Sequence, residues 1–346
     1  MKRRLKKPLL FSIVVFLFVF SLYKTCDLLN ISFHHDKSNL EQDIKEEKNN
    51  NNNIKQQYNI NTFQTEEMGQ VIYDGTFIYY NNEEYLIKRD KISGEETPIS
   101  TTTKNLAYSD DYIFGTQTYA NGNDILMDYI VQISKFGDEK QIFYKTECSY
   151  ITSVCYDGKY IYYTNESHNI YRLNTSTKES EIFIKDNEKN DYPVILGILN
   201  SNIYYIDDSY IFEYNLINNE KRVVSTQGCS YLQKPIIYNN YIYMFGNFNN
   251  NNIIRIDIKT GSQETIIDTN YLKNKTNHHQ IDSFNIIGGY IFINVDKDLY
   301  YMKVTDTFGL EHYKTTSSSN ILVTDDSLFF IDNGIEEIFV NWLISK

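Results

Sequence analysis

Proline, cysteine and tryptophan are all scarce in this chain of 346 residues. It contains four prolines and a single tryptophan, Trp342, and its four cysteines are Cys26, Cys148, Cys155 and Cys229. Proline cannot donate to a strand ladder, so its scarcity leaves long stretches that can form continuous strands. A large domain can form its core without disulfides, unlike a small secreted module. We therefore expect the fold to depend on side-chain packing rather than on cross-links.

Basic residues are also scarce outside the N-terminus. The chain has 33 lysines and arginines against 45 aspartates and glutamates, and six of the 33 lie in the first 24 residues, where no acid occurs. The remainder has 27 basic and 45 acidic residues, which is a net charge of −18. Such a field repels phosphate backbones, which argues against nucleic acid as a partner and against tight general adhesion to anionic lipid.

Motifs for catalysis and metal binding are missing as well. The sequence has no His-Glu-x-x-His, no Gly-x-Ser-x-Gly, no phosphate-binding glycine loop and no Cys-x-x-Cys. Its densest metal-capable set is His278, His279 and Asp282, in and after a predicted loop at 270–280. Adjacent histidines rarely bind one ion without a third fixed ligand, so a solvated polar loop is favoured. We therefore predict no catalytic residues, no metal site and no cofactor.

The N-terminus has the pattern of an export signal. Five basic residues among the first eight precede an apolar run at 9–23, and Lys24 ends this run. A basic flank before an apolar run directs the basic end towards the cytoplasm, so the rest of the chain is expected outside the cytoplasmic membrane. The run of about 15 residues is short for a full bilayer span, which leaves a cleaved signal open.

Three outcomes remain for this segment. No small-x-small cleavage site follows the run, which favours an uncleaved signal anchor over 1–30 and a single-pass protein of the cell membrane. Cys26 lies where a lipidated cysteine would, but Tyr23 and Lys24 do not suit a lipidation signal. A lipoprotein at Cys26 and a secreted protein are the alternatives. In all three the C-terminal domain is extracytoplasmic.

A polar segment at 31–57 separates the apolar run from the remainder of the chain. It is rich in charge between 36 and 48 and contains five consecutive asparagines at 49–53. Such a composition buries too little apolar surface to offset its ordering entropy. We therefore predict a disordered tether at 31–57 and one folded domain at 58–346.

A phrase repeated seven times indicates the fold of this domain. Each copy is a turn pair followed by an aromatic and aliphatic run, and the copies lie at 74–80, 110–114, 157–163, 200–205, 239–244, 288–292 and 325–330. Successive copies begin 36, 47, 43, 39, 49 and 37 residues apart. A period near forty with strand-like units is typical of a β-propeller. The sequence therefore predicts an all-β, seven-bladed β-propeller.

The third unit shows how one repeat forms a blade. Its segment 150–156 is apolar enough for an inner strand, an Asp-Gly pair at 157–158 signals a hairpin, and 160–163 is the second strand. Further turns separate the third and fourth strands, 169–173 and 179–184. Each repeat thus predicts four antiparallel strands, and no segment after the tether predicts a helix.

The seventh unit is one strand short. The chain ends after three candidate strands, 320–323, 328–331 and 337–343. An open edge is a liability, which this architecture removes by closing its ring. The segment 58–63, Tyr-Asn-Ile-Asn-Thr-Phe, alternates like a half-buried strand. We predict that it closes the last blade by pairing with the strand that contains Ile338, Val340 and Trp342.

Several repeats resemble a known motif. The segment 161–165 reads Ile-Tyr-Tyr-Thr-Asn and precedes Asn-Ile-Tyr-Arg-Leu-Asn at 169–174, and the segments 203–207 and 328–332 are similar. This pattern resembles the YWTD unit of low-density-lipoprotein-receptor-type propellers, and the chain is similar to exported bacterial Tyr-rich propellers of unknown function. The resemblance covers about residues 66–346, but Tyr or Phe stands where Trp is usual. The receptor type implies six blades and a ligand-binding or scaffold role.

The crossings between repeats offer a candidate binding site. In a propeller these crossings approach the mouth of the central channel, where four aromatic residues could form a ring: Tyr150, Tyr192, Tyr231 and Phe284. Packing between blades is the competing interpretation, because Tyr buries a large ring while its hydroxyl reaches the wet rim.

The two functional hypotheses differ in what the mouth would contain. The first is a membrane-tethered, extracytoplasmic binding or scaffold propeller without a catalytic site, with a surface protein or glycan as its unknown partner. An aromatic, uncharged mouth favours it. The alternative is an exported glycan-acting hydrolase or lyase, which needs clustered acids on the channel rim.

Overall fold

The computed structural model describes residues 57–58, 71–82, 84–120, 125–137, 139–146, 150–185, 193–208, 210–226, 235–246, 252–306, 309–318, 321–323, 327–331 and 335–340. All of them belong to one compact unit, Ile54–Lys346. The predicted anchor at 1–30 and the tether at 31–56 lie outside these residues. No helix among the described residues has the length and the apolar character needed to cross a membrane.

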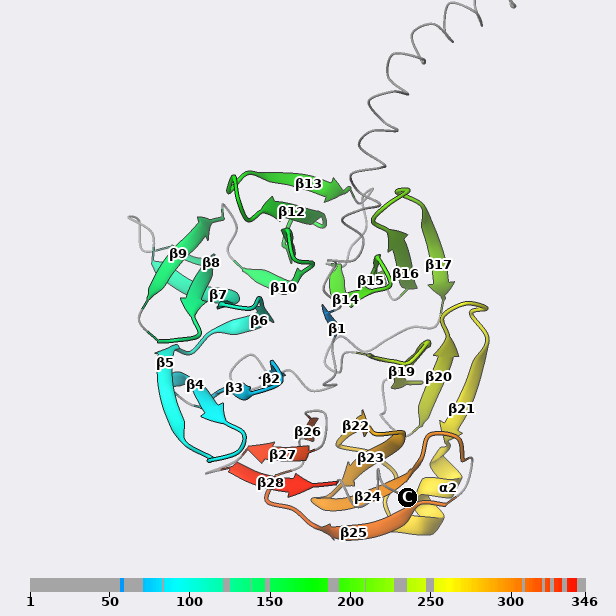
Figure 1. The fold of residues 1–346 in the computed structure, drawn as a ribbon. Helices are drawn as coiled ribbons and strands as arrows, with labels where there is room; N and C mark the ends of the chain where they lie inside the picture. Colours follow the sequence, from blue (N-terminus) through cyan, green and yellow to red (C-terminus); the bar gives the residue numbers. More distant parts are fainter. Residues whose placement is uncertain are drawn as a thin grey trace, which may run out of the picture. The chain divides into compact units, whose positions relative to one another are not determined.

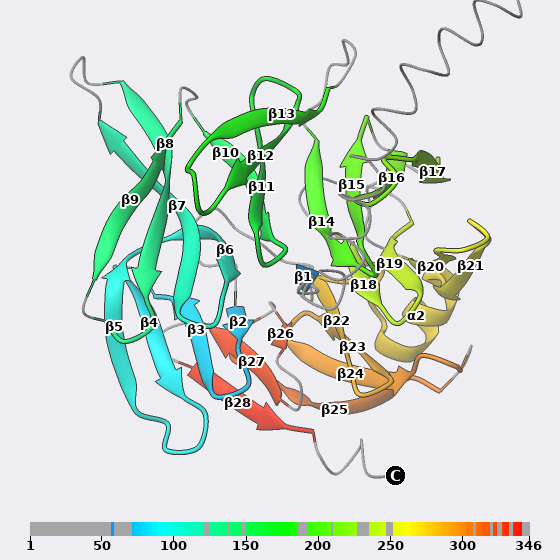
Figure 2. The same cartoon turned by 45° about the horizontal axis from the view of Figure 1, so that its top comes forward.

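Seven antiparallel sheets follow one another along this unit, and they are the blades of a ring (Figures 1 and 2). Blade 1 contains β2 (Val71–Tyr73), β3 (Phe77–Asn81), β4 (Tyr85–Asp90) and β5 (Glu96–Thr101). Blade 2 contains β6 (Lys104–Tyr108), β7 (Tyr112–Ala120), β8 (Leu126–Ser134) and β9 (Lys140–Lys145). Blade 3 contains β10 (Ile151–Tyr156), β11 (Tyr160–Asn165), β12 (Ile170–Asn174) and β13 (Ser180–Ile184).

The remaining blades follow the same order. Blade 4 contains β14 (Val194–Leu199), β15 (Asn202–Asp207), β16 (Tyr210–Asn215) and β17 (Lys221–Ser225). Blade 5 contains β18 (Ile236–Tyr238), β19 (Tyr241–Phe245), β20 (Ile253–Asp257) and β21 (Gln263–Ile267). Blade 6 contains β22 (Ser283–Ile287), β23 (Tyr290–Val295), β24 (Asp298–Lys303) and β25 (Glu311–Thr315). Blade 7 contains β26 (Leu322–Val323), β27 (Ser327–Ile331) and β28 (Ile335–Phe339). The predicted seven-bladed propeller of four-stranded antiparallel blades is confirmed.

Paired aromatic residues in the second strands explain why the sheets stack. In β11, Tyr163 packs in a cluster with Phe114 of blade 2, whereas Tyr162 packs in another with Ile203 of blade 4. Successive side chains of a strand point to opposite faces of its sheet, so each blade buries both faces against its neighbours. The tyrosines at these places are at most 4% exposed: Tyr79, Tyr80, Tyr162, Tyr163, Tyr204, Tyr205 and Tyr243.

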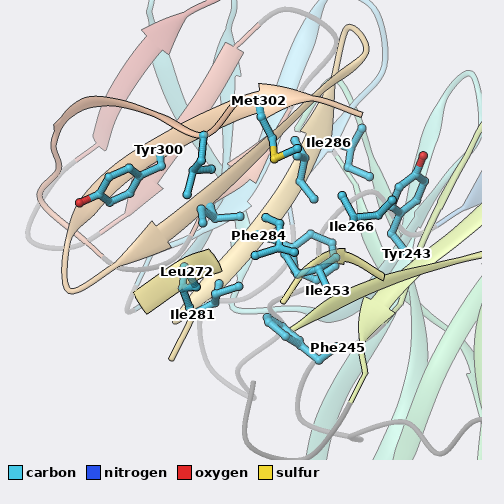
Figure 3. Packing of buried hydrophobic residues seen from close by; sticks show 14 of the residues in the cluster. Tyr243, Phe245, Ile253, Ile266, Leu272, Ile281, Phe284, Ile286, Tyr300 and Met302 are labelled. Carbon is cyan, nitrogen blue, oxygen red and sulfur yellow. The ribbon is translucent and has the colours of Figure 1, made fainter. Parts of the chain in front are cut away.

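One helix occurs where the sequence pattern predicts only a loop. It is α2 (Thr269–Thr276), between blades 5 and 6. The Asp268 carboxylate caps its first turn by accepting from the Tyr271 amide at 2.8 Å, and Asn277 ends it in a left-handed conformation. Leu272 is its one large buried residue and joins the cluster between blades 5 and 6 (Figure 3). A single apolar anchor in eight residues leaves too little periodicity to predict a helix.

Buried polar side chains fix the backbone where a new blade begins. Asn81, the last residue of β3, donates to the carbonyl of Thr103 at 2.7 Å and accepts from its amide at 3.0 Å. At the seam of blades 6 and 7, the Ser283 hydroxyl accepts from the Ile321 amide at 3.1 Å, and Asn285 donates to the Ile321 carbonyl at 2.8 Å. An unpaired buried backbone group costs about 1–3 kcal/mol, so these contacts hold each crossing in place.

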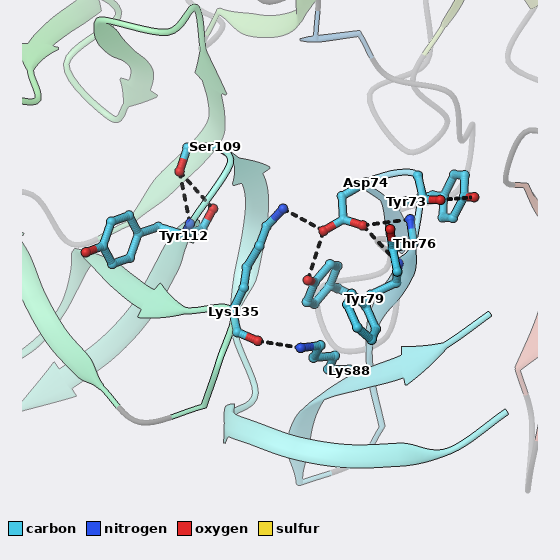
Figure 4. A network of polar contacts seen from close by, with 10 residues as sticks. Tyr73, Asp74, Thr76, Tyr79, Lys88, Ser109, Tyr112 and Lys135 are labelled. Atoms are coloured by element: carbon cyan, nitrogen blue, oxygen red, sulfur yellow. Dashed lines mark hydrogen bonds and ion pairs between the residues drawn. The ribbon is translucent and has the colours of Figure 1, made fainter. Parts of the chain in front are cut away.

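A buried ion pair adds to the seam between blades 1 and 2 (Figure 4). Lys135 Nζ lies 2.6 Å from Asp74 Oδ2, and Tyr79 Oη donates to the same oxygen at 3.0 Å. The amides of Thr76 and Phe77 donate to Asp74 Oδ1. Burial alone would raise the pKa of Asp74, but the hydrogen bonds from Lys135 and the two amides hold that pKa below its usual value. The charged carboxylate therefore ties the first turn of blade 1 to blade 2.

A polar pair joins the third and fourth strands at the same place in successive blades. Arg172 lies opposite Glu181 in blade 3, and Glu213 lies opposite Arg222 in blade 4; both pairs are ion pairs. Blade 7 has no fourth strand among the described residues, and its residue at this place is Glu337.

Glu337 finds its partner across the seam that closes the ring. Its Oε2 lies 3.3 Å from Arg89 Nη2 of blade 1, and Arg89 Nη1 also pairs with Glu96 at 2.7 Å. The side chains of Arg89 and Glu337 are 21% and 11% exposed. Under this pair, Ile78 of blade 1 and Phe329 of blade 7 share an apolar cluster. Blades 1 and 7 are therefore joined by packing and by an ion pair that takes the place of one inside blade 7.

The predicted closure of the last blade by 58–63 is not what the structure shows for Tyr58. The short strand β1 (Gln57–Tyr58) pairs antiparallel with β14, the inner strand of blade 4, with Tyr58 opposite Gly197. The rest of the predicted closing strand, 59–63, lies outside the described residues, and β28 pairs within them only with β27. The channel-side edge of an inner strand presents unpaired amides and carbonyls just as an outer edge does, so an extended segment can pair with either.

The ion pair across the closing seam can be measured by a double-mutant cycle. We expect Arg89→Ala and Glu337→Ala to couple by about 1–3 kcal/mol in unfolding free energy, because Arg89→Ala removes the ion-pair partner of the mostly buried Glu337, whereas Glu337→Ala leaves Arg89 paired with Glu96. The control is Arg172 with Glu181, a pair within one blade in which Glu181 is 62% exposed, so its coupling should stay below about 1 kcal/mol. Denaturant unfolding measures both cycles. Equal coupling in the two pairs would contradict a special role for the closing pair.

Candidate binding site at the channel mouth

The connections between blades lie on one face of the ring, here called the crossing face. Within a blade the four strands are antiparallel and lie in sequence order from the axis outward. The chain therefore returns from an outer strand to the next inner strand on the side where second and third strands also join. The inner strands β6 and β10 begin on this face and lie side by side in Figures 1 and 2. Their first residues therefore lie on the crossing face at blades 2 and 3.

The structure separates the four predicted mouth residues. Tyr150 directly precedes β10 and is 39% exposed, which suits a residue of the rim. Phe284 is fully buried in β22, in the cluster between blades 5 and 6, with its ring 4.9 Å from that of Phe245 (Figure 3). Its side chain therefore packs between blades. Tyr192 and Tyr231 lie outside the described residues.

Blade 2 holds the backbone beside Tyr150 on both sides. The amide of Ile151 donates to Asp128 Oδ2 at 2.9 Å, and its carbonyl accepts from Asn105 Nδ2 at 2.8 Å. Asp128 is in β8 and Asn105 is in β6, so two strands of blade 2 meet the first residue of β10. Tyr150 is thereby attached to a rigid part of the ring, and the exposed Lys104 begins the neighbouring inner strand.

Asp128 is a residue beside the candidate site that the sequence patterns did not identify. It is 6% exposed, and both carboxylate oxygens are used: Oδ1 accepts from the Thr118 hydroxyl at 2.6 Å and Oδ2 accepts from Ile151. An acid inside an otherwise apolar strand was the available signal, because such a group is rarely buried without partners. Because it is mostly buried and accepts hydrogen bonds from Thr118 and Ile151, this carboxylate holds the backbone beside the rim.

The described residues contain no group of three His, Cys, Asp or Glu side chains that could hold a metal ion. His278 and His279 are exposed in the segment after α2. Asp282 accepts from the amide of Asp296 at 2.7 Å, so its carboxylate supports a turn of blade 6. Cys155 is buried, and burial raises the pKa of its thiol to about 12, which keeps it protonated.

No family model matches this chain, and no curated protein matches it in sequence. Solved structures match its fold. The extracellular domain assigned to a hybrid two-component system of Bacteroides thetaiotaomicron has a TM-score of 0.54 at 14% identity, over 82% of this chain and 39% of that chain. PorZ, an essential surface component of the type-IX secretion system of Porphyromonas gingivalis, has a TM-score of 0.51 at 9% identity, over 81% and 38%. The designed protein Ika8 has a TM-score of 0.52 at 9% identity, over 80% and 85%. At such identities the likeness shows the fold alone.

Alanine substitutions distinguish a rim residue from a packing residue. We expect Tyr150→Ala to change the unfolding free energy by less than about 0.5 kcal/mol, because its side chain is substantially exposed. Phe284→Ala should lower it by about 3–5 kcal/mol, because it leaves a cavity between blades 5 and 6. Denaturant unfolding with matched slopes measures both. A loss of more than about 2 kcal/mol for Tyr150→Ala would make that residue part of the packing instead.

Proposed function

We propose that this protein is a membrane-tethered, extracytoplasmic binding or scaffold propeller whose partner contacts the crossing face at blades 2 and 3. The observation that carries the proposal is the rim at Tyr150, an exposed aromatic residue beside a backbone that Asp128 and Asn105 hold on both sides. Aromatic residues on a rigid support are frequent anchors of binding surfaces, since they offer large contact area with little loss of entropy.

The arrangement at this rim supports binding over glycan cleavage. Glycosidases usually need two carboxyl groups about 5–10 Å apart, one of which must exchange protons. Asp128 borders the rim at blades 2 and 3, but it is 6% exposed and bonded to Thr118 and Ile151, so it supports the backbone instead of facing a substrate as one of two such acids. The resemblance to YWTD-type propellers supports the same choice, because it implies a ligand-binding or scaffold role.

The location outside the membrane is part of the proposal. Its support is the basic flank followed by the apolar run at 9–23, and the uncleaved anchor is the form we favour. A lipoprotein at Cys26 or a secreted protein would place the domain on the same side. The partner is then a surface protein or glycan, and the charge of −18 after the first 24 residues argues against nucleic acid.

Protease protection tests the location. Protease added to intact cells should remove the domain at 58–346, while a cytosolic control protein stays intact and a detergent-treated sample loses both. Cleavage should begin in the tether, because its composition does not support stable structure. Survival of the full-length chain on intact cells, with cleavage only after lysis, would reverse the proposed topology.

Capture from surface extracts tests the binding role. The full-length chain in detergent should retain a surface protein or glycan, and Tyr150→Ala should reduce the retained amount at least about tenfold, as loss of an aromatic anchor does. Phe136→Ala is the control, because Phe136 is 77% exposed but lies in the turn between the third and fourth strands of blade 2, on the face opposite the crossings. Equal losses for both variants would refute the site, and release of shortened sugars from the extract would favour the hydrolase or lyase.

A further inference from the structure

The channel-side edge of β14 differs from the other inner strands. Each inner strand pairs on its outer side with the second strand of its blade, and among the described residues β14 is the one that also pairs on the channel side. Its partner is β1, with Gln57 opposite Ile198 and Tyr58 opposite Gly197. Figure 1 shows β1 inside the ring beside β14.

A bulge in β14 lies next to this pairing. Ile195 is opposite Tyr205 and Gly197 is opposite Tyr204, so Leu196 is an extra residue in the ladder. Gly197 has a φ of +151°, a value that residues with a side chain rarely adopt. Bulges bend a strand and increase its twist, so the edge of β14 turns away from a regular ladder where β1 meets it.

Most side chains of β14 pack in the seams on either side of blade 4. Ile195 and Ile198 pack against blade 3, and Leu196 packs against blade 5. Each of these three side chains is at most 5% exposed. The backbone of β14 therefore faces the channel. Gly197 has no side chain that would block an approaching segment.

We infer that the channel-side edge of β14 is a strand-accepting site for an extended polypeptide, and that Gln57–Tyr58 occupies it in cis. Recognition is by main-chain hydrogen bonds, the mode in which a peptide adds a strand to a sheet edge. The inference rests on the proposed binding role, because it names the class of partner. Such a partner must displace a segment of the same chain.

Displacement has a defined cost. A tethered segment competes at an effective concentration on the order of millimolar, so a free peptide binds weakly while β1 is in place. Removing the backbone donors of β1 should therefore expose the site without changing it. The variant Gln57→Pro/Tyr58→Pro does so, since proline has no amide hydrogen. The matched control is Glu46→Pro/Glu47→Pro in the tether.

Hydrogen exchange on the full-length chain in detergent tests the cis pairing. In the variant Gln57→Pro/Tyr58→Pro, the segment 194–199 should exchange at least about tenfold faster than in wild type, whereas the Glu46→Pro/Glu47→Pro control should leave it unchanged. In wild type, the amides of 57 and 58 should exchange more slowly than those at 40–48. This last comparison needs no variant, so it decides even if the proline variant fails to fold. Equal exchange in either comparison overturns the inference.

Peptide binding tests whether the edge accepts a strand in trans. The probe is a fluorescent peptide with the sequence of residues 54–62. It should bind Gln57→Pro/Tyr58→Pro at least about tenfold more tightly than wild type, as the effective concentration of β1 implies. A version with proline at the two positions of Gln57 and Tyr58 should not bind. Equal binding to both proteins, or equal binding of both peptides, overturns the inference.

One further variant separates this site from the rim. Adding Tyr150→Ala to the proline variant should leave peptide binding unchanged, because the edge of β14 presents backbone and does not use Tyr150. If the peptide binds but no surface partner is captured, the binding site at Tyr150 is refuted and the strand-accepting edge of β14 is supported. If a surface partner is captured but the peptide does not bind, the strand-accepting edge of β14 is refuted and the binding site at Tyr150 is supported.

Discussion

At four seams of this ring, one blade is held to the next through the backbone that begins the new blade. The Ser153 hydroxyl accepts from the Ile195 amide at 2.9 Å between blades 3 and 4. Asn81 accepts from the Thr103 amide between blades 1 and 2, and Ser283 accepts from the Ile321 amide between blades 6 and 7. A single blade is a small sheet with two apolar faces, which is not stable alone in water. Stacking buries both faces, and the polar contacts determine where along its neighbour each blade sits. Without them the apolar faces could slide, because hydrophobic packing has little directionality.

The last seam needs a different solution, because no chain connection crosses it. The ring is closed there by an apolar cluster and by Glu337, which pairs with Arg89 of blade 1. In blades 3, 4 and 5 the equivalent residues form ion pairs with the fourth strand of their own blade, as Glu213 does with Arg222. In blade 7 the described residues include no such strand, so the same side-chain position is used between blades. This position also reaches the next blade where a fourth strand is present, since Arg255 donates to the Val304 carbonyl and Lys88 donates to the Lys135 carbonyl.

The candidate site uses the same seam contacts. Ile151 begins blade 3 and is held on both backbone groups by blade 2, which places the preceding Tyr150 on the rim. The residue proposed for binding therefore directly precedes a structural contact between blades. The solved structures with this fold share little sequence with it, so they support the architecture and leave the partner to be found from the site itself.

Local pattern was enough to predict the architecture and most strand positions. In blade 3 the predicted strands at 160–163, 169–173 and 179–184 lie close to where β11, β12 and β13 occur. The reason is that strand periodicity and hairpin signals depend on neighbours in sequence. The side chains of Tyr162 and Tyr163 pack against different neighbouring blades, because successive side chains of a strand point to opposite faces of its sheet.

Contacts between distant residues were decided only by the tertiary structure. Tyr150 and Phe284 stand at similar places in their repeats, yet Tyr150 precedes its strand and is exposed, whereas Phe284 lies inside its strand and is buried. Arg89 and Glu337 are 248 residues apart, and Tyr58 pairs with blade 4 rather than blade 7. Any sheet edge accepts a strand and any carboxylate accepts a guanidinium. The sequence therefore determined what each segment could form, and the closing of the ring determined which partner each one met.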